Sequence, residues 1–239
     1  HEARGTLHEA RGTLHEARGT MHGALKLIAF DLDGTLIDIY SSWGWIHKFF
    51  GVSNEHNLQA YLRKEFDDLE FMRRDIALWL NIKKNLTIYD IEKIFEPVPL
   101  MPGAEECIFR LKSRGYKTAI VSGGIDIIAN RVAKQLNIDH VLANGLAYDG
   151  NGQLTGEGIL NVELLDKGKS LKNLQAKLNI KAAETISVGN SFIDVPMFNV
   201  SACGIAFCPT DDEIVRHADF VVRDRDLRMV ASLIENNEV

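Results

Sequence analysis

Short apolar runs alternate with amphipathic segments along most of this chain, and this alternation predicts an α/β fold. The strand-like apolar runs are Lys26–Phe30, Tyr116–Val121, Thr185–Val188, Gly204–Phe207 and Phe220–Val222. Apolar residues at three- and four-residue spacing predict helices at Pro102–Arg114, Ile125–Leu136, Ser170–Leu178 and Asp226–Ile234, and a short one from Val195-Pro196. Runs that are apolar on both faces are typical of strands buried in a parallel sheet. We therefore predict a doubly wound, Rossmann-like parallel sheet covered by helices on both sides, with a hairpin turn at residues 149–152 beside it.

The stretch from residue 39 to residue 99 breaks this rhythm and predicts an inserted helical cap. It contains no clear buried strand, and its apolar residues recur at helical spacing. The two stripes are Trp43, Ile46, Phe49 and Phe50, and then Leu58, Leu62, Phe66 and Leu69. Thr87 and Asp90 have the spacing of a capping box before a further helix. We expect residues 21–38 and 100–239 to form the α/β core and residues 39–99 to form a small helical cap domain.

Residues 1–20 differ from the rest of the chain. The unit HEARGTL begins at His1, recurs at His8 and starts again at His15. A seven-residue period can indicate a coiled coil, but each unit offers only Ala and Leu as apolar residues, with a Gly between them. We interpret residues 1–20 as a tag or cloning artefact before a natural start at Met21, and we expect no secretion signal.

Composition and charge exclude several classes of function. The 239 residues carry a formal charge of −6, and acidic and basic residues are interspersed. No segment resembles a nucleic-acid-binding patch, and no apolar run approaches the ~20 residues that span a bilayer. The three cysteines (Cys107, Cys203 and Cys208) form no CxxC pair. We expect a cytoplasmic protein with reduced thiols and a small-molecule partner, without nucleic acid or membrane, and as either a monomer or a homodimer.

Two aspartates directly after the first predicted strand carry the strongest chemical signal. The run Asp31-Leu32-Asp33-Gly34-Thr35-Leu36 follows the strand Lys26–Phe30. In a doubly wound sheet, ligands bind beyond the carboxyl ends of the strands, and two carboxylates there repel each other unless a cation lies between them. Gly34 permits a tight turn that brings backbone N–H groups toward an anion. A solvated Asp-Gly turn is the alternative for an isolated pair, but the position behind a buried strand favours a cation-assisted site.

Four runs stand, in order, at predicted strand ends and helix starts of this chain. AFDLDGTL contains Asp31 and Asp33, VSGG contains Ser122, DKGKSL contains Lys167, and ISVGNSFIDVPMF contains Asn190 and Asp194. Together these runs resemble the four motifs of the haloacid dehalogenase superfamily. Within that superfamily, VSGGIDIIANRVAKQLNI and AFCPTDDEIVRHADFVV are most similar to the phosphoserine phosphatases and their relatives. The likeness extends over roughly residues 25–234 and is weakest in the predicted cap.

This resemblance implies a Mg²⁺-dependent phosphatase that acts on a small phosphate ester. Asp31 would attack phosphorus and carry the phosphoryl group, and Asp33 would protonate the leaving oxygen and then activate water. Lys167 would neutralise the nucleophile and the transferring group. Phosphate contacts would come from the Ser122 hydroxyl and from Gly34, Thr35, Gly123 and Gly124. Mg²⁺ would be held by Asp31, the backbone carbonyl of Asp33, Asn190 and Asp194.

Several positions depart from the family pattern. Asn190 replaces the usual aspartate of the fourth motif, which predicts weaker metal affinity, and Ile193 replaces an asparagine that contacts phosphate. In phosphoserine phosphatases, an acidic residue in the cap binds the substrate amine and an arginine binds its carboxylate. The corresponding positions here are Tyr40 and Leu78, with Arg73 and Arg74 as candidate substitutes. The reaction is therefore predicted more firmly than the substrate.

Two alternatives to a phosphatase remain open. A phosphotransferase would pass the same aspartyl phosphate to an alcohol instead of water. A catalytically weak phosphate-binding regulatory module would fit the loss of metal-site charge at Asn190. A dehalogenase is disfavoured because Asp33 is the acid–base carboxyl that phosphate ester chemistry requires.

Overall fold

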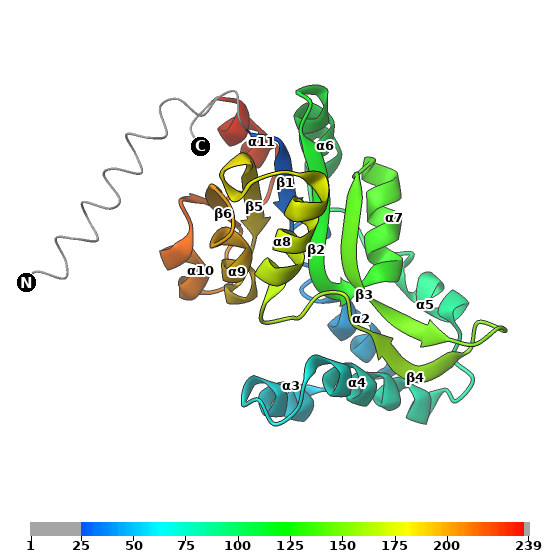
Figure 1. Ribbon diagram of the computed structural model, residues 1–239. Coiled ribbons are helices and arrows are strands. Elements are labelled where there is room, and N and C mark those ends of the chain that lie inside the picture. The colour runs from blue at the N-terminus through cyan, green and yellow to red at the C-terminus, as the bar shows by residue number, and fades with distance from the viewer. Residues whose placement is uncertain (1–24, 237–239) are drawn as a thin grey trace, which may run out of the picture.

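The computed structural model describes residues 25–236, so the repeat at residues 1–20 lies outside the described residues. Within them, the strands form one seven-stranded sheet in the order β4-β3-β2-β1-β5-β6-β7 (Figure 1). Neighbouring strands are parallel except for the antiparallel pair β3–β4. The strands are β1 (Leu27–Phe30), β2 (Lys117–Ile125), β3 (His140–Tyr148), β4 (Leu154–Ile159), β5 (Thr185–Gly189), β6 (Cys203–Phe207) and β7 (Phe220–Val222). The order reverses beside β1, as expected for the predicted doubly wound fold.

Helices lie on both faces of this sheet and beyond one of its ends. They are α2 (Ser42–Phe50), α3 (Glu55–Leu62), α4 (Asp68–Ile82), α5 (Ile88–Phe95), α6 (Ala104–Ser113), α7 (Asp126–Leu136), α8 (Lys167–Leu178), α9 (Val195–Phe198), α10 (Asp212–His217) and α11 (Arg228–Glu235). Residues of α6, α7 and α11 share one apolar core, and residues of α8 and α9 form a second. Within residues 25–236, no helix combines the length and apolar character needed to cross a membrane.

The central strand β1 explains how the sheet positions the site. All four of its side chains are fully buried. Ile28 and Phe30 belong to the core on the α6–α7 side, whereas Leu27 and Ala29 pack with α8 on the other side. A strand buried on both faces is held firmly in register, and β1 pairs with β2 and β5 along its whole length. The residues that follow Phe30 are therefore held in place at the end of the central strand.

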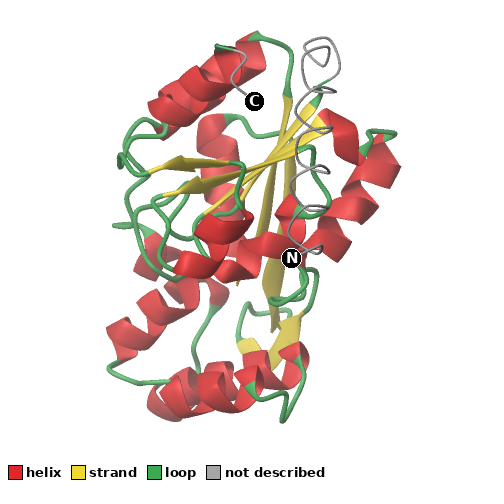
Figure 2. Cartoon of the chain, turned by 90° about the vertical axis from the view of Figure 1, so that its left-hand side faces the viewer, coloured by secondary structure: helices red, strands yellow, loops and turns green. Residues whose placement is uncertain are grey.

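The helices α2–α5 gather beyond one end of the sheet (Figures 1 and 2). The β3–β4 hairpin reaches this segment and packs against α4. Backbone hydrogen bonds join the two parts, from Ile88 N to Gly152 O at 2.8 Å and from Leu154 N to Leu86 O at 2.9 Å. The predicted hairpin turn at residues 149–152 is confirmed. The helical character of residues 42–95 follows the sequence pattern, and the cap boundaries themselves remain a prediction.

The apolar stripes of this segment differ in part from the prediction. Ile46 is buried, but Phe49 is 63% exposed. The second stripe is interrupted because α3 ends at Leu62 and the chain turns through Lys64, whose φ is +61°. The capping box of Thr87 and Asp90 is present, with the Asp90 N–H donating to the Thr87 hydroxyl at 3.2 Å.

Candidate active site

Three neighbouring strands bring the predicted site residues to one edge of the sheet. Asp31 follows β1, and Asn190 follows β5. Ser122 lies near the end of β2, which continues to Ile125 and not only to Val121 as predicted. Because β2, β1 and β5 are parallel neighbours, their carboxyl ends meet. Lys167, the first residue of α8, reaches this edge from the α8 side.

A buried ion pair network joins Asp31, Lys167 and Asp194. Lys167 Nζ donates to Asp31 Oδ1 at 2.7 Å and to Asp194 Oδ1 at 2.6 Å. The three residues are at most 2% exposed. Burial opposes the charge on Lys167, but the two carboxylates outweigh it and raise the pKa of this ammonium group above its usual range. Lys167 is therefore a fixed positive charge beside Asp31.

Both carboxylate oxygens of Asp194 accept hydrogen bonds from neighbouring residues. Its Oδ2 accepts from the backbone N–H of Asn190 at 2.8 Å and of Ser191 at 3.1 Å, while Oδ1 is bound to Lys167. These contacts favour a role in holding Lys167 and the Asn190 loop. The Asn190 side chain itself packs on Gly34, where an added Cβ would lie 2.1 Å from Asn190 Nδ2. Gly34 has a φ of +73°, so this close approach needs glycine.

Asp33 is held through one of its two carboxylate oxygens. Its Oδ2 accepts from the backbone N–H of Ser42 at 2.8 Å and from the Ser42 hydroxyl at 2.9 Å. Its Oδ1 is shielded from solvent and has no hydrogen-bond partner within the described residues. A buried carboxylate oxygen without a partner is costly, which indicates a position completed by a ligand or by a proton.

Both aspartates have pKa values above the usual range of a carboxyl group. Burial raises the pKa of Asp31 to about 7, and the charge of Asp194 adds to this effect while Lys167 opposes it. Burial also raises the pKa of Asp33 to about 6, although the hydrogen bonds from Ser42 act in the opposite direction. Asp33 can therefore hold a proton near neutral pH, as its predicted role requires.

The groups predicted to contact phosphate differ in whether their hydrogen-bonding atoms are already occupied. The Gly124 N–H donates to Ser122 Oγ at 3.0 Å, which leaves the Ser122 hydroxyl hydrogen free for a phosphoryl oxygen. The Gly34 N–H donates to Ile37 O at 3.1 Å and the Thr35 N–H to Leu32 O at 3.2 Å. These amides therefore stabilise the turn. The buried Thr35 hydroxyl has no partner within the described residues.

The oxygen atoms of this cluster fit Mg²⁺. Two buried carboxylates, those of Asp31 and Asp194, share one ammonium group, so the cluster carries excess negative charge, and Asp33 Oδ1 lacks a partner within the described residues. Among residues 25–236, no three Asp, Glu, His or Cys side chains are grouped around one metal position. An ion would therefore need Asp31 together with neutral oxygens, the Asp33 carbonyl and the Asn190 amide oxygen. Oxygen donors of this kind suit Mg²⁺, which retains several waters.

The two positions predicted to bind the substrate carry no charge, and the two candidate arginines are already paired. Tyr40 is 84% exposed, and Leu78 packs against the apolar core. Arg73 is bound to Glu157 and Glu70. Arg74 is bound to Glu70, and its guanidinium lies 4.1 Å from the ring centroid of Phe66. Both arginines are thus engaged by acidic side chains on α4 and β4.

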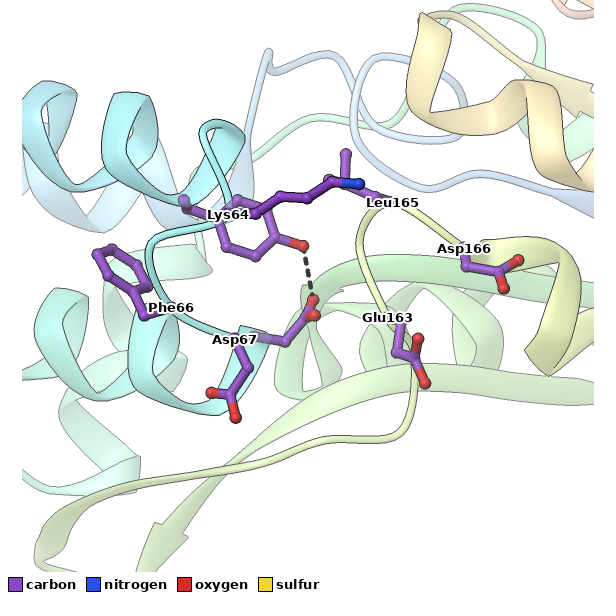
Figure 3. Close-up of a pocket in the computed structure, with 8 residues that line it drawn as sticks. Lys64, Phe66, Asp67, Glu163, Leu165 and Asp166 are labelled. Carbon is purple, nitrogen blue, oxygen red and sulfur yellow. Dashed lines mark hydrogen bonds between the residues drawn. The ribbon is translucent and has the colours of Figure 1, made fainter.

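A small pocket lies between the helical segment and the loop that leads to Lys167. Figure 3 shows Lys64, Phe66 and Asp67 on one side and Glu163, Leu165 and Asp166 on the other. Its volume is about 200 Å³. Asp68 joins the two sides, because its Oδ1 accepts from the Tyr61 hydroxyl at 3.0 Å and from Leu164 N at 2.8 Å. The pocket is lined by both acidic and aromatic side chains.

Sequence reasoning missed three residues that hold the site. Ser42 contacts Asp33, as described above. Trp43 Nε1 donates to Gly123 O at 3.1 Å, and Asn144 Nδ2 donates to the same carbonyl at 3.3 Å. The sequence pattern predicts Trp43 only as part of an apolar stripe, and Ser42 resembles an ordinary serine at a helix start. The neighbouring pair Ser41-Ser42 was the one available signal, because a helix needs a single N-cap.

Comparison with known proteins agrees with the motifs and the geometry. Residues 28–199 match the family model described as haloacid dehalogenase-like hydrolase. A phosphoserine phosphatase of Idiomarina loihiensis is 34% identical, with 89% of this chain and 95% of the relative covered. One of Methanocaldococcus jannaschii is 32% identical, with 88% and 98% covered. A solved structure described as a phospho-aspartyl intermediate analogue of phosphoserine phosphatase has a TM-score of 0.73 at 31% identity, covering 89% of this chain and 98% of that one. The predicted family and fold are confirmed: this chain belongs to the haloacid dehalogenase-like hydrolases.

Proposed function

We propose that this chain hydrolyses a small phosphomonoester through an aspartyl phosphate on Asp31. The observation that carries the proposal is the buried contact of Asp31 with Lys167, next to a second aspartate whose pKa is raised to about 6 by burial. A fixed cation, a nucleophile and a separate acid are the parts that phosphoryl transfer needs. The similarity to phosphoserine phosphatases supports the same reaction class.

The reaction has two steps, the formation of the aspartyl phosphate and its hydrolysis. In the first, an oxygen of Asp31 bonds to phosphorus, the ester P–O bond breaks, and Asp33 gives its proton to the leaving oxygen. In the second, Asp33 takes a proton from water, the water oxygen bonds to phosphorus, and the bond to Asp31 breaks to release inorganic phosphate. Lys167 and the Ser122 hydroxyl stabilise the negative charge of the phosphoryl oxygens in both steps.

A divalent cation, Mg²⁺, belongs to this proposal. Asp31, the Asp33 carbonyl and Asn190 would hold it, and Asp194 would keep Lys167 and the Asn190 loop in place. When bound, Mg²⁺ neutralises charge on the phosphoryl group and the nucleophile. The excess of buried carboxylates over ammonium groups supports this assignment.

The substrate is a small phosphate ester, and phosphoserine is the first candidate because of the relatives. Tyr40 and Leu78 offer no charge for an amino acid head group, so the proposal extends to other small esters. The three cysteines, two of them buried and none in a disulfide within the described residues, support a cytoplasmic location.

A phosphate-release assay on a panel of esters tests the function. We expect Mg²⁺-dependent turnover of at least one small ester by the wild type. Asp31→Asn should lower it at least roughly 10³-fold with an unchanged circular dichroism spectrum, because an amide is a poor nucleophile. Full activity in Asp31→Asn would overturn the nucleophile assignment. Adding acceptor alcohols distinguishes a phosphotransferase, which would form new esters. No turnover of any ester would favour a phosphate-binding module.

A further inference from the structure

Two consecutive serines at the start of α2 have different tasks. Ser41 is the N-cap, and its hydroxyl accepts from Gly44 N at 3.1 Å. Ser42 is the first helical residue and is fully buried. Its side chain turns away from the helix and toward the end of the sheet, because it contacts Asp33 and Ile125. Helix capping therefore does not explain Ser42.

The Ser42 hydroxyl has a single defined orientation. It donates its hydrogen to Asp33 Oδ2 at 2.9 Å and accepts from Ile125 N at 3.1 Å. Since the Ile125 N–H fills one lone pair, the hydroxyl hydrogen is directed to the carboxylate. The backbone N–H of Ser42 donates to the same oxygen at 2.8 Å. Ser42 thus connects the end of β2 to Asp33 through two donors on one oxygen.

The space around this contact is filled. A Cβ added at Gly124 would lie 2.7 Å from Ser42 Oγ, 2.9 Å from Asp33 Oδ2 and 3.1 Å from Ser122 Oγ. The three oxygens therefore converge on the α-carbon of Gly124. Asp33 Oδ2 is held by the two Ser42 donors beside Gly124, and Oδ1 is the oxygen that lacks a partner within the described residues.

We propose that Ser42 is a positioning residue that fixes Asp33 through Oδ2, so that Oδ1 is the oxygen that exchanges the proton. This inference rests on the proposed phosphatase function. In the first step, the proton leaves Asp33 Oδ1 for the leaving oxygen of the ester, and the resulting carboxylate is stabilised by the two Ser42 donors. In the second step, Oδ1 takes a proton from the attacking water. Ser42 itself exchanges no proton.

The dependence of rate on the leaving group tests this role. A poor leaving group, such as an alkoxide, needs a well-placed acid, whereas 2,4-dinitrophenolate leaves without protonation. We expect Ser42→Ala to lower kcat/KM for alkyl and phenyl phosphates at least roughly ten-fold, the loss of one charge-assisted hydrogen bond. The loss for 2,4-dinitrophenyl phosphate should stay below about two-fold. Ser42→Cys, which is close in size but donates weakly, should behave like Ser42→Ala.

Two further variants serve as controls. Ser41→Ala removes the helix cap one residue away and should lower the melting temperature without changing the leaving-group dependence. Ser42→Thr keeps the hydroxyl and, when folded, should restore the wild-type dependence. An equal loss of kcat/KM for all esters in Ser42→Ala and Ser42→Cys would overturn the positioning role. A wild type that releases no phosphate from any ester would refute the proposed function, and the positioning role with it.

Discussion

Asn190 gives the buried cluster one negative charge fewer than an aspartate would. It packs against Gly34, so an isosteric change fits the site. We predict that Asn190→Asp lowers the half-saturating Mg²⁺ concentration roughly ten-fold, because affinity for hard cations rises with the charge of the ligands. Without metal, the variant should melt at a lower temperature because a further carboxylate joins Asp31 and Asp194. Titration calorimetry with Mg²⁺ measures the first effect. An affinity that stays the same or weakens would remove Asn190 from the ligand set.

Asp33 should also make the stability of the metal-free chain depend on pH. Burial raises its pKa from 3.8 to about 6, so the folded state holds a proton that the unfolded state releases. The free energy of unfolding therefore falls as pH rises between about 4 and 6, and the loss persists above that range. We predict that Asp33→Asn stabilises the chain by up to about 3 kcal/mol at pH 8 and hardly at all at pH 4. Urea unfolding in chelator measures this, and an equal gain at both pH values would contradict it.

At the scale of single residues, the sequence indicated the candidate catalytic groups better than the groups that hold them. Asp31, Ser122 and Lys167 lie where the motifs placed them. Beyond the serine pair, nothing in the sequence indicates the role of Ser42, because that role depends on the direction of one hydroxyl after α2 packs against the sheet. Tertiary contacts of this kind have no periodicity in the sequence.

At the scale of elements, strands made of apolar residues were predictable, and the strand with a polar centre, β3, was not. β1 is entirely apolar and buried, and its prediction is confirmed. β3 was missed because its centre contains Asn144-Gly145, which resembles a loop. Asn144 is accommodated because its Oδ1 accepts from Asn161 N at 2.9 Å and Val162 N at 2.8 Å. The end of α3 was missed because Lys64, with a φ of +61°, is not a typical turn residue.

Close packing of α8 on α9 should depend on Gly168. A Cβ there would lie 2.4 Å from the carbonyl oxygen of Pro196, and a backbone atom cannot move aside cheaply. We predict that Gly168→Ala displaces α8, destabilises the chain by about 1–3 kcal/mol and lowers kcat, because Lys167 moves away from Asp194. Gly150→Ala is the matched control, since no atom lies within 4 Å of its added Cβ. Denaturant unfolding and turnover assays measure both variants. Wild-type behaviour of Gly168→Ala would show that the contact relaxes freely.

At the scale of the whole molecule, the helical segment closes over the reacting groups. Asp31, Ser122, Lys167 and Asp194 are each at most 2% exposed. A phosphate ester cannot reach side chains buried to this degree, so we expect the segment to move away from the sheet during each turnover. The hydrogen bond from Leu164 N to Asp68 Oδ1 joins the helical segment to the loop that leads to Lys167. The chain order of the elements predicted a cap, but only the folded structure shows which contacts close it.

Asp68 is therefore expected to control the closed state. Burial and the Asp68 charge raise the pKa of Tyr61 above its usual range, so its hydroxyl remains a donor to Asp68. We predict that Asp68→Ala speeds hydrogen exchange in α3 and around residues 163–166 and raises KM several-fold, because both Tyr61 and Leu164 N lose their acceptor. Asp67→Ala is the matched control, since Asp67 caps α4 through Glu70 N at 2.9 Å and makes no bond to Leu164. If both variants changed exchange and KM equally, general loosening of α4 would explain the effect, and the hydrogen bond between Asp68 and Leu164 would have no special part in closure.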